Sequence, residues 1–202
     1  MSADAGLQNC SNDPCSVASP YTLVDIGANL THKCFNNREL DCVIDRSKAC
    51  GIKKIMVTGT CVDFKAKNLL RLARVSILGI FHATAVHPHD ASAFNNDTAK
   101  ELEELARNPE CVAIGECGLD FNRNFSPPED QKRAFEAQVD LACRINKPLF
   151  VHEREAASTM VEILSRHTDN LPPTVIHCFT GTVDEATAYI NMGLYIGLTG
   201  MP

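Results

Sequence analysis

Hydrophobic and polar positions follow a repeating order along this chain, in which a short apolar run is succeeded by a segment with helical spacing. Short apolar runs that end in glycine or polar residues are typical of buried parallel strands. Segments with apolar residues every three to four positions are typical of helices packed on one face. The order predicts strands at 21–30, 54–60, 80–89, 112–121, 149–152, 175–177 and 194–199, and helices at 38–50, 62–75, 98–108, 126–146, 156–167 and 184–192.

Capping signals place the ends of several predicted helices. The segments TAKE (98–101) and SPPE (126–129) fit the capping box, in which a hydroxyl residue and a glutamate three positions later satisfy free amides of the first turn. Proline in the first turn also favours a helix start at 126–129. Gly51 and Pro109 end the helices before them.

Strands that alternate with helices indicate an α/β protein of the TIM (β/α)8-barrel type, which normally needs about 250 residues. With 202 residues, the chain is short by about one strand and its flanking helices. We therefore expect seven barrel strands to be present and the last to be missing, with the barrel at 21–202. Residues 1–20 are rich in Ser, Asn, Asp and Pro, which predicts a disordered tail.

Charge and cysteine content narrow the class of protein. The net charge of −6 argues against a general electrostatic grip on nucleic acid, but a bound divalent cation can supply the positive charge that phosphates require. The ten cysteines form no CxxC pair, so we expect free thiols in a reducing compartment. No signal peptide or membrane-length apolar segment is recognisable. These features favour the cytoplasm, with the nucleus as an alternative.

Candidate metal ligands stand at the ends of three consecutive predicted strands. Glu116, His152 and His177 end the fourth, fifth and sixth strands. Because barrel enzymes place their chemistry at the carboxyl ends of the strands, these side chains are expected to meet at one mouth. Imidazole and carboxylate together suit Zn²⁺, Mn²⁺ or Fe²⁺, and added oxygen ligands would admit Mg²⁺. A residue of either type taken alone at a strand end more often has a structural hydrogen-bonding role, but the joint placement of the three on successive strands favours a metal site.

Other polar residues near the strand ends can be assigned either a functional or a structural role. His87, Arg123 and Arg154 are candidates for binding substrate phosphate, against the alternative of ordinary loop or surface residues. His89 shares both readings with His87. Asp120 is expected to lie beyond its strand and to support a ligand histidine or cap the following loop. Cys117 and Cys178 are assigned packing roles.

Five segments between about residues 22 and 200 form a set that is specific in order and in spacing: VDIGANLT (24–31), AVHPHD (85–90), AIGECGLDFNRNF (113–125), VHEREA (151–156) and IHCFTG (176–181). Together they resemble the TatD family of metal-dependent deoxyribonucleases. The resemblance implies a TIM-barrel metal hydrolase that trims DNA from its 3′ end with Mg²⁺. By position, it assigns Glu116, His152 and His177 as metal ligands.

Two features depart from that pattern. The His-x-His pair of many relatives is replaced by Gly27-Ala28-Asn29, so one metal is expected to be held more weakly or through water. The catalytic Asp of a Thr-Asp-x-Pro segment has no match up to Pro202. The resemblance therefore places the catalytic acid beyond Pro202.

The leading hypothesis is a divalent-metal-dependent 3′–5′ exodeoxyribonuclease, with DNA as substrate and no obligate protein partner or membrane. Mg²⁺ is the expected cofactor, and Mn²⁺ and Zn²⁺ are alternatives. Two further hypotheses stay open. One is a metallo-hydrolase of an amide, lactone or phosphotriester, since fold does not fix substrate. The other is a truncated, catalytically silent barrel.

Overall fold

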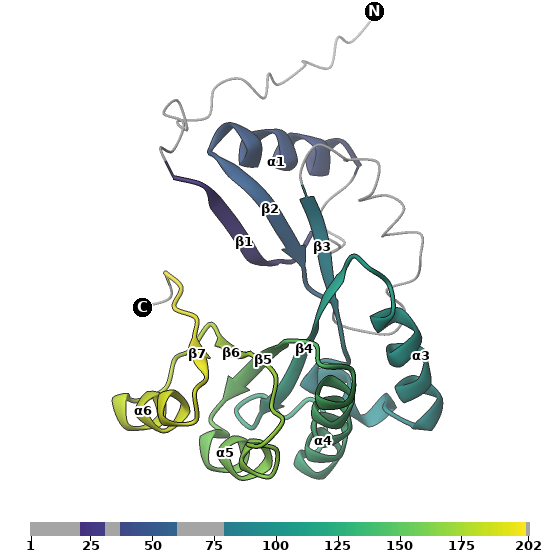
Figure 1. The fold of residues 1–202 in the computed structure, drawn as a ribbon, viewed down its shortest axis with the longest axis vertical. Helices are drawn as coiled ribbons and strands as arrows, with labels where there is room; N and C mark the ends of the chain where they lie inside the picture. The colour runs from purple at the N-terminus through teal and green to yellow at the C-terminus, as the bar shows by residue number, and fades with distance from the viewer. Residues whose placement is uncertain (1–20, 31–36, 60–78, 201–202) are drawn as a thin grey trace, which may run out of the picture.

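The computed structural model describes residues 21–30, 37–59 and 79–200 (Figure 1). The tail predicted at 1–20 and the helix predicted at 62–75 lie outside these ranges. Among the described helices, none has the length and apolar character needed to cross a bilayer.

A seven-stranded parallel sheet in the order β1-β2-β3-β4-β5-β6-β7 forms the frame. Because each strand pairs with the next in the sequence, the sheet curls into part of a barrel wall (Figure 1). The α/β barrel-type fold predicted from the alternating pattern is therefore confirmed. The strands are β1 Leu23–Ala28, β2 Ile52–Val57, β3 Gly79–Thr84, β4 Cys111–Asp120, β5 Leu149–Arg154, β6 Thr174–His177 and β7 Tyr195–Ile196.

Helices cover the outer face of this wall. In Figure 1, α1 lies beside β2, while α3, α4, α5 and α6 follow the strands β3, β4, β5 and β6 along the chain. The helices are α1 Asn37–Ala49, α3 Asn96–Ala106, α4 Pro128–Ile145, α5 Ala157–Ser165 and α6 Val183–Asn191, with a short 3-10 helix η1 at Pro88–Ala93. Their positions agree with the predicted periodicity to within a few residues.

The largest core cluster lies between the middle strands and the helices α3 to α6. Ile114 and Leu119 of β4, Phe135 and Val139 of α4, and Val151 of β5 are all completely buried in it. Burying an apolar side chain of this size contributes about 1.5–3 kcal/mol each to folding. This packing fixes β4 and β5 against α4.

The predicted strand at 80–89 is too long, because β3 ends at Thr84. Pro88 instead starts η1, and His87 caps it by accepting a hydrogen bond from the His89 N–H at Nδ1, 3.2 Å away. Proline suits this first position because it has no amide hydrogen to satisfy. The two histidines therefore lie on a turn and not on a strand.

Two capping predictions are wrong in detail. The N-cap of α3 is Asn95, which forms a capping box with Thr98, so the helix starts before the TAKE segment. At α4 the N-cap is Pro127 and no side chain caps it. The Ser126 hydroxyl instead donates to the His89 carbonyl and accepts from the Ser92 N–H.

Two other expectations need correction. Asp120 is the last residue of β4, so it has not left the strand. The additional length follows from pairing with β5, in which Asp120 lies opposite Arg154. Among the described cysteines Cys50 is disulfide-bonded, whereas Cys111, Cys117, Cys143 and Cys178 are free thiols as expected.

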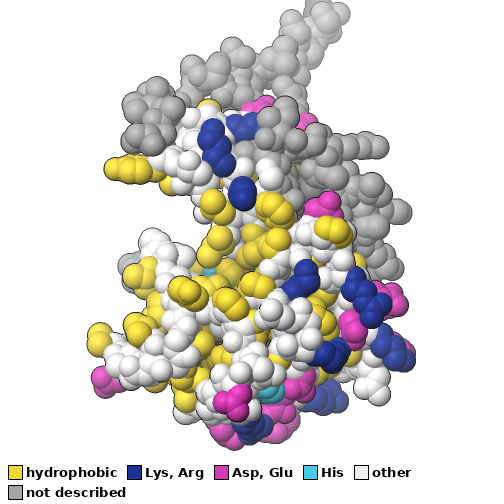
Figure 2. Space-filling view, viewed as in Figure 1, with side chains coloured by type: hydrophobic (Ala, Val, Ile, Leu, Met, Phe, Trp, Pro, Cys, Tyr) yellow, Lys and Arg dark blue, Asp and Glu magenta, His cyan; other side chains and the backbone are white. Residues whose placement is uncertain are grey.

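The two edge strands of the described sheet, β1 and β7, are much more open. Val24 and Ile26 are about half exposed, and Tyr195 is more so. A cleft of about 450 Å³ separates these strands and is lined by apolar residues of β1 together with Phe150 and His177. Figure 2 shows apolar side chains around this hollow.

Candidate metal centre

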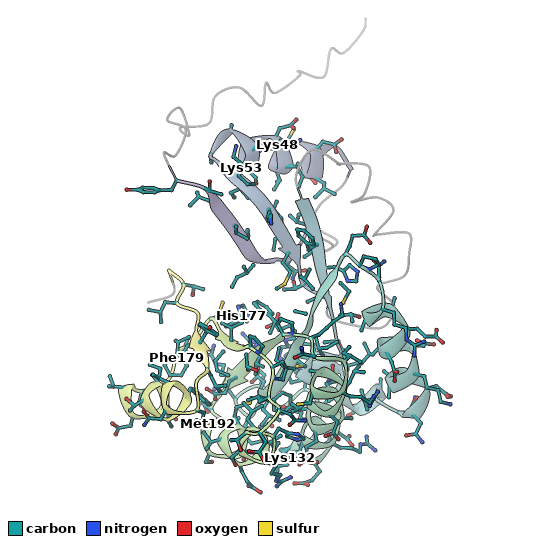
Figure 3. All side chains as sticks on the ribbon, in the orientation of Figure 1. Lys48, Lys53, Lys132, His177, Phe179 and Met192 are labelled. Carbon is teal, nitrogen blue, oxygen red and sulfur yellow. The ribbon has the colours of Figure 1, made fainter. Side chains whose placement is uncertain are left out.

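Three consecutive strands bring Glu116, His152 and His177 together. The Glu116 Oε1 atom lies 3.0 Å from His152 Nδ1 and 3.0 Å from His177 Nε2. The parallel register sets this geometry, because His152 lies directly opposite His177 in the β5–β6 pair. Figure 3 shows His177 on the side of its strand that faces the hollow, away from Lys132 on the outer surface.

Electrostatics keep Glu116 ionised. Burial alone would raise the pKa of its carboxyl group, but hydrogen bonds from His152, His177 and His87 outweigh burial and hold this pKa well below its ordinary value. For His152 burial acts in the opposite direction and would lower the pKa, but the neighbouring carboxylates of Glu116 and Asp120 raise it. The group therefore offers an anionic oxygen beside two imidazoles, which is a suitable donor set for a divalent cation.

His87 lies beside this group but has a different orientation. Its Nε2 atom is 3.6 Å from Glu116 Oε1, while Nδ1 is occupied by the His89 N–H. Burial lowers the pKa of His87, which favours a neutral ring. A neutral ring that accepts at Nδ1 carries its proton on Nε2. His87 is thus arranged as a hydrogen-bond donor toward the centre.

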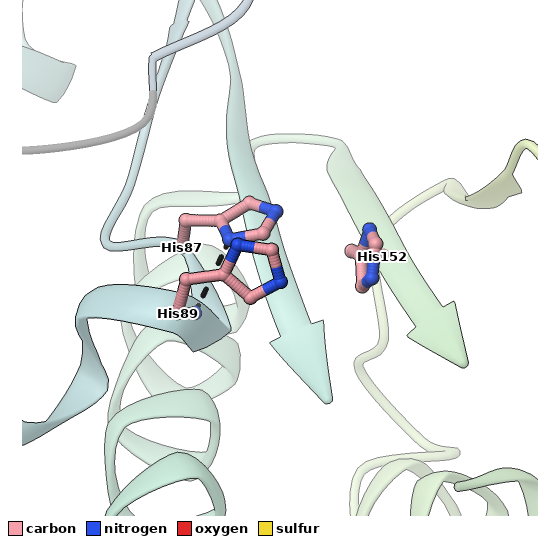
Figure 4. A group of neighbouring side chains, drawn as sticks. All are labelled: His87, His89 and His152. Carbon is pink, nitrogen blue, oxygen red and sulfur yellow. Dashed lines mark hydrogen bonds between the residues drawn. The ribbon is translucent and has the colours of Figure 1, made fainter. Parts of the chain in front are cut away.

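Asp120 stands behind the same centre and is completely buried. Its Oδ2 atom is 2.9 Å from His89 Nε2 and 3.1 Å from His152 Nε2. Burial would raise its pKa, but the Arg123 backbone N–H, His89 and His152 lower it to about 2. Figure 4 shows His87 and His89 side by side on one segment and His152 facing them from β5.

Gln131 of α4 holds Asp120 by its backbone. Its side-chain oxygen accepts from the Asp120 N–H at 2.8 Å, and its amide nitrogen donates to the Asp120 carbonyl at 3.1 Å. Sequence reasoning did not identify Gln131, because a glutamine on a helix carries no signal of its own. Only the packing of α4 on β4 makes it part of the centre.

A cleft of about 250 Å³ contains the candidate metal ligands and the predicted substrate-binding residues together. Glu116, His152 and His177 line it beside His87, Arg123 and Arg154, and Thr180 completes the rim. The structure therefore brings to one place all six residues selected from the sequence. The cleft therefore has two arginines in its lining together with the anionic Glu116.

Two overlapping groups of side chains in the described residues could hold a metal ion. One is Glu116, His152 and His177, and the other is His87, His89 and His152. In each group the ligand atoms lie within 4.8 Å of one another. A neutral imidazole has one free lone pair, so His152 can serve only one of them.

Comparison with known proteins identifies the family. The family model described as "TatD related DNase" matches residues 24–202. The chain belongs to the TatD family. The resemblance drawn from the five sequence segments is therefore confirmed, and a candidate metal centre at the strand ends is in keeping with it.

Curated TatD relatives are similar over most of this chain. A protein of Edwardsiella piscicida named "3'-5' ssDNA/RNA exonuclease TatD" is 45% identical over 178 residues, which are 88% of this chain and 68% of the relative. A Shigella flexneri protein of the same name is 44% identical, over 88% of this chain and 67% of the relative. The chain spans about two thirds of the length of these relatives.

Solved structures of TatD proteins share the fold. A hydrolase TatD family protein from Entamoeba histolytica superposes with a TM-score of 0.79 at 28% identity, over 89% of this chain and 65% of that one. A TatD homologue from Escherichia coli K12 gives 0.76 at 26% identity, over 87% and 67%. Both likenesses agree with the barrel-type sheet described above.

Proposed function

We propose that this protein hydrolyses phosphodiester bonds of single-stranded DNA from the 3′ end, with a divalent cation held by Glu116, His152 and His177. The observation that supports this most directly is the convergence of these three side chains on one point from the C-terminal halves of β4, β5 and β6. The printed names of the relatives, which specify 3′–5′ exonucleases of ssDNA and RNA, point to the same reaction.

The proposed cation is Mg²⁺, with Mn²⁺ and Zn²⁺ as alternatives. Two imidazoles and one carboxylate also bind the latter two ions well. A cation here would polarise a phosphate oxygen and lower the pKa of water. The donor atoms fit such an ion, because they lie within 4.8 Å of one another around a carboxylate that is kept ionised.

The surrounding residues of the cleft would bind and orient the substrate. Arg123 and Arg154 line it, and their guanidinium groups suit phosphate oxygens. His87 presents its Nε2–H to the same space and would donate a hydrogen bond to a phosphate oxygen. The two guanidinium groups offset the net charge of −6 where nucleic acid would be held.

We further propose that residues 21–202 act as one barrel-type domain, with residues 1–20 as a tail. A single continuous sheet from β1 to β7 supports one domain.

The test is a nuclease assay on single-stranded DNA labelled near its 5′ end, with an RNA of equal sequence in parallel. Shortening from the 3′ end is expected with Mg²⁺ or Mn²⁺ and not with excess chelator. Glu116→Gln is expected to reduce the rate by more than about 100-fold, since loss of an outer partner alone costs about 10- to 100-fold.

Glu104→Gln, an exposed glutamate of α3, is the matched control and should retain the rate. Activity that survives chelation, or that persists in Glu116→Gln, would contradict the proposal. Cation binding without cleavage of either nucleic acid would favour a silent barrel or another substrate instead.

A further inference from the structure

The imidazole of His152 lies between two carboxylates, and only one of them belongs to the proposed metal ligands. Its Nδ1 atom is 3.0 Å from Glu116 Oε1, and its Nε2 atom is 3.1 Å from Asp120 Oδ2. A histidine that ligates a metal through one nitrogen commonly donates its other N–H to a carboxylate. The arrangement of His152 fits this pattern, with Nδ1 on the side of the proposed metal ligands and Nε2 on the side of the supporting carboxylate of Asp120.

The carboxylate of Asp120 accepts hydrogen bonds from its neighbours and is held in a fixed position. Its carboxylate is completely buried, and its Oδ1 atom accepts the Arg123 backbone N–H at 2.8 Å. The two hydrogen bonds with Gln131 fix its backbone against α4. The remaining oxygen, Oδ2, is thereby directed at His152 and His89.

We propose that Asp120 is a positioning residue that fixes the tautomer of His152, so that Nε2 keeps its proton and Nδ1 offers its lone pair beside Glu116. This inference rests on the proposed function, because it assumes that Glu116, His152 and His177 hold a cation. It adds that His152 ligates through Nδ1, and that the choice of nitrogen is made by a residue outside the ligand set.

The same contacts argue that the group of His87, His89 and His152 does not hold a second cation. His89 donates its Nε2–H to the Asp120 oxygen that His152 uses, and His87 Nδ1 accepts the His89 N–H. The Arg123 guanidinium also lies 3.4 Å from that oxygen and would repel a cation there. We therefore expect this second group of histidines to hold no cation of its own.

His177 is positioned by a different device. Its ring stacks on Phe150 with centroids 4.5 Å apart and planes 29° apart, and among the described contacts Glu116 is its carboxylate partner. Replacing Asp120 should therefore change the chemistry of His152 and leave His177 as it is. This difference makes His177 an internal reference in a spectrum of both rings.

The decisive measurement is a ¹⁵N–¹H correlation spectrum of the histidine rings of the full chain, loaded with Mg²⁺ alone. The wild-type His152 ring is expected to carry its proton on Nε2. In Asp120→Asn, the amide oxygen should keep the Arg123 N–H, so that the amide NH₂ faces His152 and favours the opposite tautomer. His177 should be unchanged.

Calorimetric titration with Mg²⁺ gives the second readout. Asp120→Asn is expected to weaken binding by about 10- to 100-fold, whereas Asp130→Asn, a surface aspartate of α4 that bonds Ser92 and Arg133, should leave affinity unchanged. Far-ultraviolet circular dichroism checks the fold of both variants. If Asp120→Asn does not fold, the wild-type spectrum alone decides.

The outcomes separate this inference from the proposed function. Wild-type protein that binds no divalent cation would overturn both. Wild-type protein that binds one cation with the His152 proton on Nδ1, or an Asp120→Asn variant with unchanged affinity and tautomer, would overturn only the positioning role.

Discussion

The middle strands β4 and β5 and the edge strands β1 and β7 differ sharply in their surroundings. Nearly every residue of β4 is buried, and β5, which lies between β4 and β6, is mostly buried as well. In β1, by contrast, Leu23, Val24 and Ile26 are all substantially exposed. β7 has only two residues, and Tyr195 is largely exposed.

This difference matters because most of the candidate metal centre lies on the buried middle strands. Glu116 and His152 come from β4 and β5, and Asp120 is supplied by the same two-strand unit through β4. Side chains on rigid, well-packed elements hold a site geometry more closely than those on mobile ones. The edge strand β1 contributes one wall of a cleft. The charged side chains Glu116 and Asp120 and the imidazole of His152 come from β4 and β5.

The largest effect is expected where β4 and β5 touch most closely. Gly118 of β4 has φ +143°, and a Cβ atom there would overlap the His152 carbonyl oxygen. Gly118→Ala must therefore strain its backbone and push the two strands apart. We expect a loss of about 3–6 kcal/mol in the free energy of unfolding, measured by urea denaturation, together with loss of Mg²⁺ binding.

Gly193→Ala separates strain from overlap in that experiment. Gly193 also has a positive φ, +78°, but an added Cβ would meet nothing within 4 Å. Its expected cost is about 1 kcal/mol, with Mg²⁺ affinity retained. Equal losses in the two variants would show that close contact of β4 with β5 is unimportant.

A smaller effect is expected from truncating one apolar side chain in each region. Leu149 of β5 is buried in the main core, while Ile26 of β1 is about half exposed. Leu149→Ala should lower the free energy of unfolding by about 2–5 kcal/mol. Ile26→Ala should lower it by no more than about 1 kcal/mol, because half of the side chain already contacts solvent.

Thermal and urea unfolding of the two variants test this directly. If Ile26→Ala were as damaging as Leu149→Ala, then β1 would be buried in solution by something beyond the described residues. The difference in burial between the middle strands and the edge strands would then hold only for the described residues.

The sequence predicted the fold and the metal candidates because both depend on pattern and order. Apolar runs ending in Glu116, His152 and His177 are visible without any structure, and a parallel sheet brings consecutive strand ends together by necessity. The length of β4 was not visible, because pairing with β5 decides where that strand ends. The sequence pattern therefore places Asp120 beyond the strand, and it predicts only that this residue supports a ligand histidine or caps the following loop.

The position of His87 and the contribution of Gln131 depended on packing even more. Pro88 starts η1, which turns His87 into a cap with one nitrogen already occupied. Gln131 reaches Asp120 only because α4 lies on β4 at that level. Neither contact has a spacing that a single sequence reveals.

The smallest expected effect concerns Phe150, which joins the two regions. It is a buried residue of β5, but it also lines the open cleft, and its ring stacks on the His177 ring. A stacked aromatic pair is worth about 0.5–1.5 kcal/mol beyond burial. Phe150→Leu should therefore cost about 1 kcal/mol in unfolding free energy and weaken Mg²⁺ binding by less than about 10-fold, because 1.4 kcal/mol corresponds to tenfold.

Phe135→Leu is the matched substitution, because Phe135 is a fully buried phenylalanine of α4 in the main core. It should destabilise the fold by a similar amount and leave Mg²⁺ affinity unchanged, as it carries no ligand ring. Calorimetric titration of both variants distinguishes local support from general loosening. Affinity that falls equally in both would mean that His177 is held by the stability of the whole sheet, so the open side would matter to the centre as much as the buried one.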